Sequence, residues 1–413
     1  MALISMLYSK RHRQNGAALL FYEGIGDPWK RERLENMKFI HLADVHLGCI
    51  PDGKASWAKE RGRELWETFR STLDDADKMG ADLVLIAGDL FHRTPDETQL
   101  REVNYLMGSH PKLCFVLMAG NHDCNSPSSA WDDFEFARNV AFLGNTRCEC
   151  VRFPALKTEV YGFSHDRNEI TAARYDHIHP DHNDYIHILL AHGGDAMHIP
   201  INPAALERSG FDYIALGHIH KMSEPVPDLV VYPGALSPID AGDEGAHGYI
   251  AGEIFGESRL PGTDSAPAHG RRDAQGDGST RRYGVHTRFV TKALREYVSL
   301  PVRVEEDDTV FAVRDRVEAQ IHRRGRENIY RIILEGQRDP SINIDTTLIE
   351  RCGMVLSVED RTVPSFHIEE LKERCKGQLI GRFIESFEGH ERSMTEEKAL
   401  QYGLEALLNA SRD

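Results

Sequence analysis

The chain has 413 residues, of which 41% are hydrophobic, and a formal net charge of −16 at pH 7. This length exceeds one ordinary domain, so we expect two or three folded units, each with its own core. No apolar run approaches the roughly 20 residues of a membrane span, so we expect a water-soluble protein with no membrane contact. The negative charge argues against binding nucleic acid by bulk electrostatics alone, but bound divalent ions would supply positive charge locally.

The seven cysteines are scattered, without a CxxC pair or a regular spacing. This arrangement argues against both a zinc ribbon and a disulfide framework. We therefore expect a cytoplasmic location, where thiols stay reduced.

Residues 1–36 show neither a signal-peptide core nor a cleavage signature. Met37 then opens MKFIHLADVHLG, a buried-strand pattern that begins on a methionine. We interpret Met37 as the physiological start and residues 1–36 as an N-terminal extension that is disordered or not native. Mass spectrometry of the native N-terminus tests this.

From residue 37 to about 255, apolar runs alternate with helical stretches, as in α/β layers. Five runs are typical of strands buried on both faces, and each leads directly into a polar motif. The runs are Phe39–Leu42, Leu83–Ala87, Leu113–Ala119, Ile186–Ala191 and Tyr213–Leu216, followed by DVH, GDLFH, GNHD, HGG and GHIH respectively. Because ligands gather beyond the carboxyl ends of such strands, we expect the five loops to share one rim.

The stretch 256–284 is rich in Gly, Ser, Pro, Asp and Arg, which predicts a flexible insertion. Its arginine pairs allow contact with a polyanion, although a solvated hairpin tip is the favoured interpretation.

After residue 300 the pattern indicates a small second α/β unit. It predicts a helix at about 308–324, strands at Ile329–Leu334 and Met354–Asp360, a short helix near Thr346–Arg351, and then two helices. We place the main domain at 37–300, the second unit at 301–362 and C-terminal helices at 363–413.

The last long helix is expected to carry an apolar face. Its members are Leu371, Cys375, Leu379, Phe383 and Phe387, with Ile380 and Ile384 adjoining. Packing on its own domain is the favoured explanation, and a groove for a partner's helix or coiled coil is the alternative.

The five motifs offer carboxylate, amide and imidazole donors that can hold two divalent cations. These are Asp44, His46, Asp89, Asn121, His192, His218 and His220. The mixture suits Mn²⁺, Fe or Zn²⁺ better than a thiolate-preferring ion, and Mn²⁺ is our first choice. A single motif of this kind means little, but five in order, each after an apolar run, predict a dinuclear site.

Two ions about 3.5–4 Å apart can bind both an attacking oxygen and a phosphate oxygen. The sequence therefore predicts hydrolysis of a phosphate ester. His122 is the candidate that supplies the leaving oxygen with a proton, and Asp123 is the candidate that orients His122. The remaining histidines of this region are expected at the surface or in loops: His165, His177, His179, His182, His187 and His198.

At these motifs the chain resembles the calcineurin-like metallophosphoesterases, and within them the Mre11/SbcD group of DNA repair nucleases, including bacterial YhaO-type members. The elements that carry the resemblance are MKFIHLADVHLG, LIAGDLFH, GNHD and FDYIALGHIHK followed by VVYPGALSP. The resemblance covers about residues 37–255. It implies an α/β fold with a four-layer core of two sheets flanked by helices, then a small capping domain and terminal helices.

The resemblance also implies a division of roles among the site residues. One metal would be held by Asp44, His46 and His220, and the other by Asn121, His192 and His218, with Asp89 bridging. His122 would be the catalytic histidine, assisted by His92 at the end of GDLFH. His92 is a feature that protein phosphatases and purple acid phosphatases of the superfamily do not share.

The function implied is a Mn²⁺-dependent DNA exonuclease and endonuclease in double-strand-break repair. Its partners would be DNA, an SMC-like ATPase of the Rad50 or SbcC type, and a second copy of the chain in a homodimer. One alternative is a phosphodiesterase or phosphatase that acts on small molecules. The other is a catalytically silent scaffold subunit of an ATPase complex.

Overall fold

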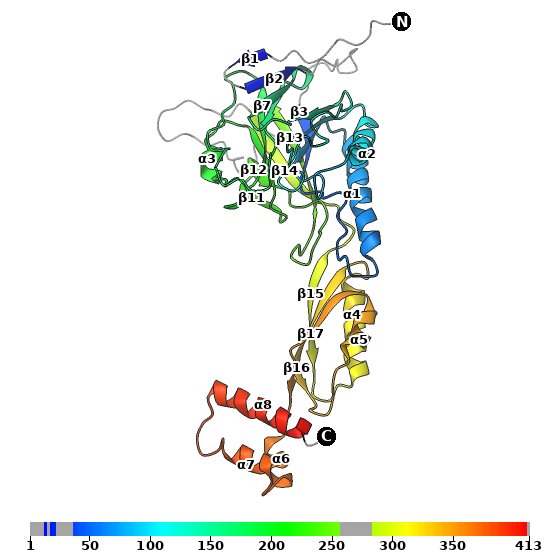
Figure 1. Cartoon of the computed structure of the whole chain (residues 1–413), viewed down its shortest axis with the longest axis vertical. Helices are drawn as coiled ribbons and strands as arrows, with labels where there is room; N and C mark the ends of the chain where they lie inside the picture. The colour runs from blue at the N-terminus through cyan, green and yellow to red at the C-terminus, as the bar shows by residue number, and fades with distance from the viewer. Residues whose placement is uncertain (1–11, 15–16, 22–35, 257–282, 411–413) are drawn as a thin grey trace, which may run out of the picture. The chain divides into compact units, whose positions relative to one another are not determined.

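The structure is a computed structural model that describes residues 12–14, 17–21, 36–256 and 283–410. It divides into two compact units, Met1–Glu296 and Tyr297–Asp413 (Figure 1). The expected boundaries at residues 300 and 362 differ from this division, because the strand that begins at Tyr297 and the C-terminal helices both belong to the second unit. None of the helices in the described ranges has the length and apolar character to cross a bilayer.

The first unit contains a six-stranded sheet in the order β14-β13-β3-β4-β5-β6. Strands β3 to β6 run parallel, and β13 pairs antiparallel with β3 and with β14. The bounds are β3 (Asn36–Leu42), β4 (Leu83–Ala87), β5 (Cys114–Met118), β6 (Val140–Phe142), β13 (Gly248–Gly256) and β14 (Tyr283–Thr291). Both β4 and β5 are buried along their whole length, as expected from their continuous apolar runs.

The second sheet has eight strands in the order β1-β2-β7-β8-β9-β10-β12-β11. Strands β8, β9, β10 and β12 run parallel, while β7 and β11 pair antiparallel with their neighbours β8 and β12. The bounds are β1 (His12–Gln14), β2 (Ala17–Phe21), β7 (Glu149–Phe153), β8 (Thr158–Gly162), β9 (Ile186–His192), β10 (Tyr213–Gly217), β11 (Ser223–Val226) and β12 (Val230–Tyr232).

Part of the N-terminal extension joins this second sheet. Strand β2 pairs in parallel with β7, and β1 pairs antiparallel with β2. The structure thus gives residues 12–14 and 17–21 as strands, within the extension that the sequence suggested to be disordered or not native. The reason is that the outer edge of β7 offers backbone donors and acceptors that an added strand can satisfy.

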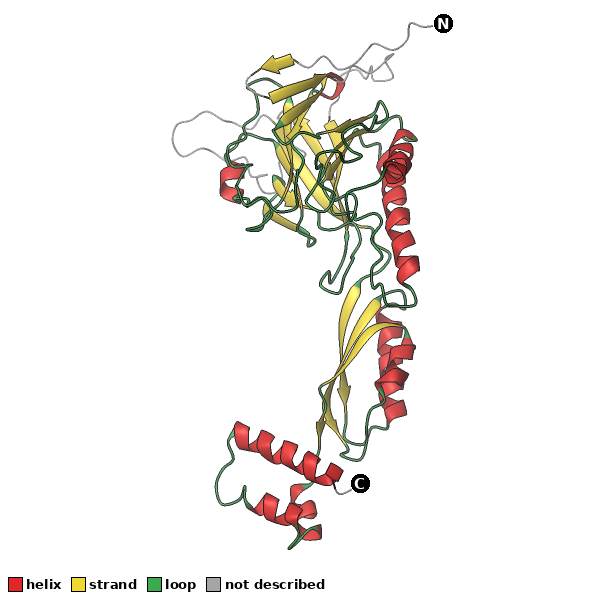
Figure 2. Ribbon diagram, viewed as in Figure 1, coloured by secondary structure: helices red, strands yellow, loops and turns green. Residues whose placement is uncertain are grey.

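The two sheets and their coverings make four layers, which confirms the predicted fold class (Figure 2). Helices α1 (Ala58–Lys78) and α2 (Glu97–Gly108) cover the outer face of the six-stranded sheet, and Phe69 packs there against Phe115. A second core cluster lies between the sheets. The outer face of the eight-stranded sheet is covered mainly by loops, with α3 (Pro203–Glu207) as a short helix and η1 (Pro154–Leu156) as a single 3₁₀ turn.

The insertion predicted at 256–284 falls largely outside the described residues. The strands on either side, β13 and β14, pair with each other up to Gly256 and Tyr283.

The second unit begins with a parallel sheet in which β16 pairs with β15, β17 and β18. The bounds are β15 (Tyr297–Val304), α4 (Val310–Arg324), β16 (Ile329–Arg338), α5 (Thr346–Ile349), η3 (Glu350–Cys352), β17 (Met354–Asp360) and β18 (Val363–Pro364). Every element expected between residues 308 and 360 is present. The apolar side chains of α4 and the sheet form a core of their own.

The expected long C-terminal helix is broken in the structure. The bounds are α6 (Ile368–Arg374), α7 (Leu379–Glu385) and α8 (Met394–Ala410). Gly377 has a φ of 77°, a left-handed conformation that ends a right-handed helix. Leu379, expected on the buried face, is consequently 69% exposed, while Ile380 and Ile384 pack against Leu404 of α8. Most of the apolar face therefore packs within its own unit.

Candidate dinuclear metal centre

The loops that carry the predicted ligands come from both sheets of the first unit. Strands β3, β4 and β5 belong to one sheet, and β9 and β10 belong to the other. The buried His41 of β3 links the two sheets, since its Nδ1 lies 2.9 Å from Tyr213 Oη and its Nε2 lies 3.0 Å from Leu216 O. The five loops meet, but the rim is formed by two facing sheets rather than by one.

Several of these loops turn sharply at the ligand itself. Asp44, His46, Asp89 and His218 have positive φ values of 51°, 52°, 50° and 94°. Such conformations cost about 1–3 kcal/mol each in non-glycine residues, and they concentrate where a function requires them. The turns aim side chains from adjacent strand ends at one centre.

The first group of donors consists of Asp44, His46 and His220, whose ligand atoms lie within 4.8 Å of one another. The Nε2 atoms of His46 and His220 are 3.1 Å apart. The other nitrogen of His220, Nδ1, lies 3.1 and 3.2 Å from the two carboxylate oxygens of Asp243. Because a carboxylate accepts hydrogen bonds, Nδ1 carries the proton, and the lone pair of neutral His220 is on Nε2.

The second group gathers around Asn121. Its Oδ1 lies 2.9 Å from His192 Nε2 and 3.0 Å from His218 Nδ1, and Asp89 Oδ2 lies 3.3 Å from His192 Nε2. The far nitrogens again face acceptors, because His192 Nδ1 lies 2.8 Å from Ala87 O and His218 Nε2 lies 2.7 Å from Asp195 Oδ2. The lone pairs of both neutral imidazoles therefore point toward the amide oxygen of Asn121.

When their imidazoles are neutral, both groups bring lone pairs into close approach, which is repulsive unless a metal ion or a proton lies among them. Carboxylate, amide oxygen and imidazole nitrogen together suit a divalent cation of the Mn²⁺, Fe or Zn²⁺ kind. The main chain is also part of the cradle, since a Cβ added to Gly120 would overlap Asp89 Oδ1 and lie 2.7 Å from His192 Nε2. The residues present therefore fit two divalent ions.

The charges in the centre favour cations. Burial lowers the pKa of His192, but the nearby Asp89 carboxylate more than offsets this and raises it to about 9. Burial also acts to lower the pKa of His220, but the hydrogen bond to Asp243 outweighs burial and raises this pKa to about 9. Burial raises the pKa of Asp44 to about 6. Burial also acts to raise the pKa of Asp89, but the surrounding imidazoles, His192 foremost, outweigh it and hold that pKa well below its usual range. At neutral pH a metal ion must therefore displace protons from His192 and His220.

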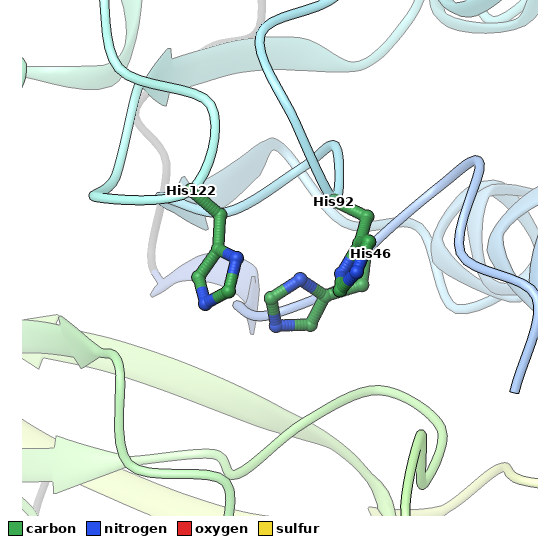
Figure 3. Close-up of side chains that lie close together, drawn as sticks. All are labelled: His46, His92 and His122. Carbon is green, nitrogen blue, oxygen red and sulfur yellow. The ribbon is translucent and has the colours of Figure 1, made fainter. Parts of the chain in front are cut away.

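His92 and His122 lie beside the first donor group. Figure 3 shows their rings together with that of His46, each from a different loop. The ring centroids of His46 and His122 are 4.9 Å apart, and His92 and His122 are stacked at 5.4 Å. The main-chain N–H of His122 donates to Asp89 Oδ1 at 2.9 Å, and the His122 side chain is exposed. It can therefore reach a group that approaches from solvent.

Asp123 does not orient His122 as the sequence suggested. The oxygens of this fully buried carboxylate accept the main-chain N–H groups of Phe91 at 3.1 Å and Gly120 at 2.7 Å. Asp123 therefore links the GNHD turn to the GDLFH loop. It stabilises the conformation of these loops and does not orient the imidazole of His122.

Of the histidines expected at the surface or in loops, His187 lies in a strand instead, whereas His165 and His198 lie in loops but contact ligand residues. His165 is fully buried, with Nε2 2.9 Å from His192 O, and His187 is 7% exposed within strand β9. His198 lies against His218, with ring centroids 4.7 Å apart. His177, His179 and His182 are exposed, as expected.

The sequence reading missed Asp195 and Asp243, which accept hydrogen bonds from His218 and His220. Asp195 lies three residues after His192, which is a weak signal. Asp243 lies 23 residues beyond its partner, in a loop without a recognisable motif.

Residues 37–222 match the family model of the calcineurin-like phosphoesterases. These residues form a calcineurin-like phosphoesterase domain. The chain is 30% identical over 243 residues to the metallophosphoesterase YhaO of Bacillus subtilis, covering 52% of this chain and 57% of that protein. It is also similar to proteins named DNA double-strand break repair protein Mre11. That of Methanopyrus kandleri is 26% identical over 246 residues (51% of this chain, 52% of the relative), and that of Aeropyrum pernix is 27% identical over 230 residues (49% and 54%).

The chain spans about half the length of these relatives. The comparisons confirm the resemblance seen at the motifs. The phosphoesterase domain contains all seven predicted ligands, together with His92 and His122.

Proposed function

We propose that the chain is a two-metal phosphodiesterase that cleaves DNA as an exonuclease and endonuclease with Mn²⁺. The observation that carries the proposal is that potential metal-ligating atoms converge in two groups, one around His46 and His220 and the other around Asn121. The similarity to proteins named DNA double-strand break repair protein Mre11 supports DNA as the substrate.

We assign Asp44, His46 and His220 to one ion and Asn121, His192 and His218 to the other, with Asp89 between the two groups. When bound, the ions would supply positive charge for the phosphate and lower the pKa of a bound water. The protein holds the donors in place through Asp243, Asp195 and Ala87 O, which keep the imidazole protons on the nitrogens that face away from the centre.

His122 would donate a proton to the leaving oxygen, and His92 would support it. The exposed ring of His122 is stacked on that of His92, so the two imidazoles lie side by side where a phosphate would approach. Burial first, and the neighbouring His122 next, lower the pKa of His92, which favours its neutral form. A neutral His92 next to His122 allows the latter to carry the proton without repulsion between two cations.

The setting that we propose is double-strand-break repair in the cytoplasm, with an SMC-like ATPase of the Rad50 or SbcC type and a homodimer of this chain. All seven cysteines are free, which agrees with a reducing compartment. Co-purification of a large coiled-coil ATPase and the mass of the native complex would test the two partnerships.

The activity is tested with purified protein and Mn²⁺ on a radiolabelled duplex and, separately, on bis-p-nitrophenyl phosphate. Degradation of the duplex supports the nuclease. Turnover of the small ester alone would instead indicate a small-molecule phosphodiesterase, and turnover of neither would indicate a silent scaffold.

His122→Ala separates catalyst from ligand. We expect a loss of about 10²–10⁴-fold in the turnover rate while the metal content stays at the wild-type value, because His122 handles a proton and does not hold an ion. His46→Ala should lose metal, and His182→Ala, a change at an exposed histidine elsewhere in the domain, should alter neither property. A loss of metal in His122→Ala would refute the assigned role.

A further inference from the structure

Asp195 lies outside the five motifs, yet it contacts a predicted metal ligand. Its Oδ2 is 2.7 Å from Nε2 of His218, whose Nδ1 faces Asn121 Oδ1 at 3.0 Å. The imidazole of His218 therefore spans from the carboxylate on one side to the metal centre on the other.

The orientation of the Asp195 carboxylate is determined by its own loop. Its Oδ1 accepts the main-chain N–H groups of Met197 at 2.7 Å and His198 at 2.9 Å. The side-chain Nδ1 of His198 lies 3.0 and 2.9 Å from the two carboxylate oxygens. With His218 Nε2 as a further donor, the roughly four lone-pair positions of the carboxylate are occupied. The carboxylate is thus a preset acceptor, although its side chain is 44% exposed.

The loop that carries Asp195 is itself fixed to the domain. Gly193 and Gly194 have φ values of 149° and 139°, and Gly193 O accepts the hydroxyl of the buried Tyr232 at 3.1 Å. A Cβ added to Gly194 would lie 2.5 Å from the same hydroxyl. The hydrogen bond to Gly193 and the close approach of Gly194 to the same hydroxyl place the start of the loop directly against strand β12.

We propose that Asp195, oriented by His198, is a positioning residue that holds His218 with Nδ1 toward the metal of the Asn121 group. The hydrogen bond keeps the His218 proton on Nε2 and makes Nδ1 a stronger donor to that metal. The proposal rests on the two-metal function above and adds a role that is specific to one of the two ions. Asp243 is the corresponding carboxylate on His220 and belongs to the other ion.

The test is a Mn²⁺ titration of the full chain, with free Mn²⁺ followed by electron paramagnetic resonance and thermal stability measured in parallel. We expect wild-type protein to bind two ions. Asp195→Ala should weaken one binding step by about 10–100-fold and leave the other unchanged. Asp243→Asn, the matched control, should weaken the opposite step, and Asp195→Glu should restore part of the lost affinity.

Asp195→Asn distinguishes positioning from a general effect on the loop, since the amide keeps the shape and one acceptor oxygen but removes the charge. A single weakened step at an unchanged melting temperature supports the proposal. The proposal is overturned if Asp195→Asn and Asp195→Ala both bind the two ions with wild-type affinity. It is also overturned if Asp195→Asn loses affinity equally at both binding steps. If wild-type protein binds fewer than two ions, the two-metal function fails and this proposal fails with it.

Discussion

Glu159 of strand β8 is a fully buried carboxylate whose ionisation stabilises the first unit. Its oxygens accept hydrogen bonds from Arg152 Nε at 2.6 Å, Tyr161 Oη at 2.8 Å and Asn183 Nδ2 at 3.1 Å, and His187 Nε2 lies 3.3 Å away. Burial alone raises the pKa of Glu159, but these partners, His187 foremost, lower it from 4.5 to about 2. At about 1.4 kcal/mol per pH unit, this difference corresponds to about 3 kcal/mol of folding free energy.

We expect Glu159→Gln to lower the free energy of unfolding by about 3 kcal/mol at neutral pH. Because the pKa of Glu159 is lower in the folded state, its contribution is fully present above pH 4.5 and is lost as the pH falls toward 2. The difference in the free energy of unfolding between wild type and variant should therefore disappear as the pH falls from 4.5 to about 2. Urea denaturation followed by tryptophan fluorescence measures this free energy. All four tryptophans precede residue 297 and therefore report on the first unit alone. A difference that stays constant through the acid range would refute the reasoning.

Two further predictions concern packing at the metal centre and in the second unit. Gly120→Ala should reduce the Mn²⁺ content without unfolding the domain, because the added Cβ overlaps Asp89 Oδ1. Gly256→Ala, where no atom lies within 4 Å of an added Cβ, is the control, and equal metal contents in both variants would contradict the prediction. Leu404→Ala should destabilise the C-terminal helices by about 2–5 kcal/mol, because Leu404 is fully buried against Ile384. Hydrogen exchange of α8 measures this loss, and unchanged protection there would contradict it.

Much of the fold could be predicted because the decisive signals are local. The segments Leu83–Ala87 and Met354–Asp360 coincide with β4 and β17, since a short apolar or partly alternating segment between turn signals has few other stable conformations. The C-terminal helix was predicted wrongly because periodicity alone cannot show that Gly377 adopts a left-handed conformation. The four-layer arrangement came from resemblance, because the strand pattern does not reveal how strands divide between two sheets.

The burial of individual histidines could not be predicted either. His165 and His187 follow no motif, yet both are buried, because segments that are distant in the sequence pack against them. For His165 the contact is the main-chain carbonyl of His192, 27 residues away. A residue's neighbours at that separation depend on how the strands are ordered in the sheet.

The sequence by itself determined which donor atoms are available to a metal and which strand each of them follows. The tertiary structure decided which nitrogen of each imidazole faces the centre. For His220 that choice depends on Asp243, and for His218 on Asp195, which lies 23 residues earlier in the chain. The position of an imidazole proton is set by the acceptor on the opposite side of the ring, and the fold alone brings that acceptor into contact.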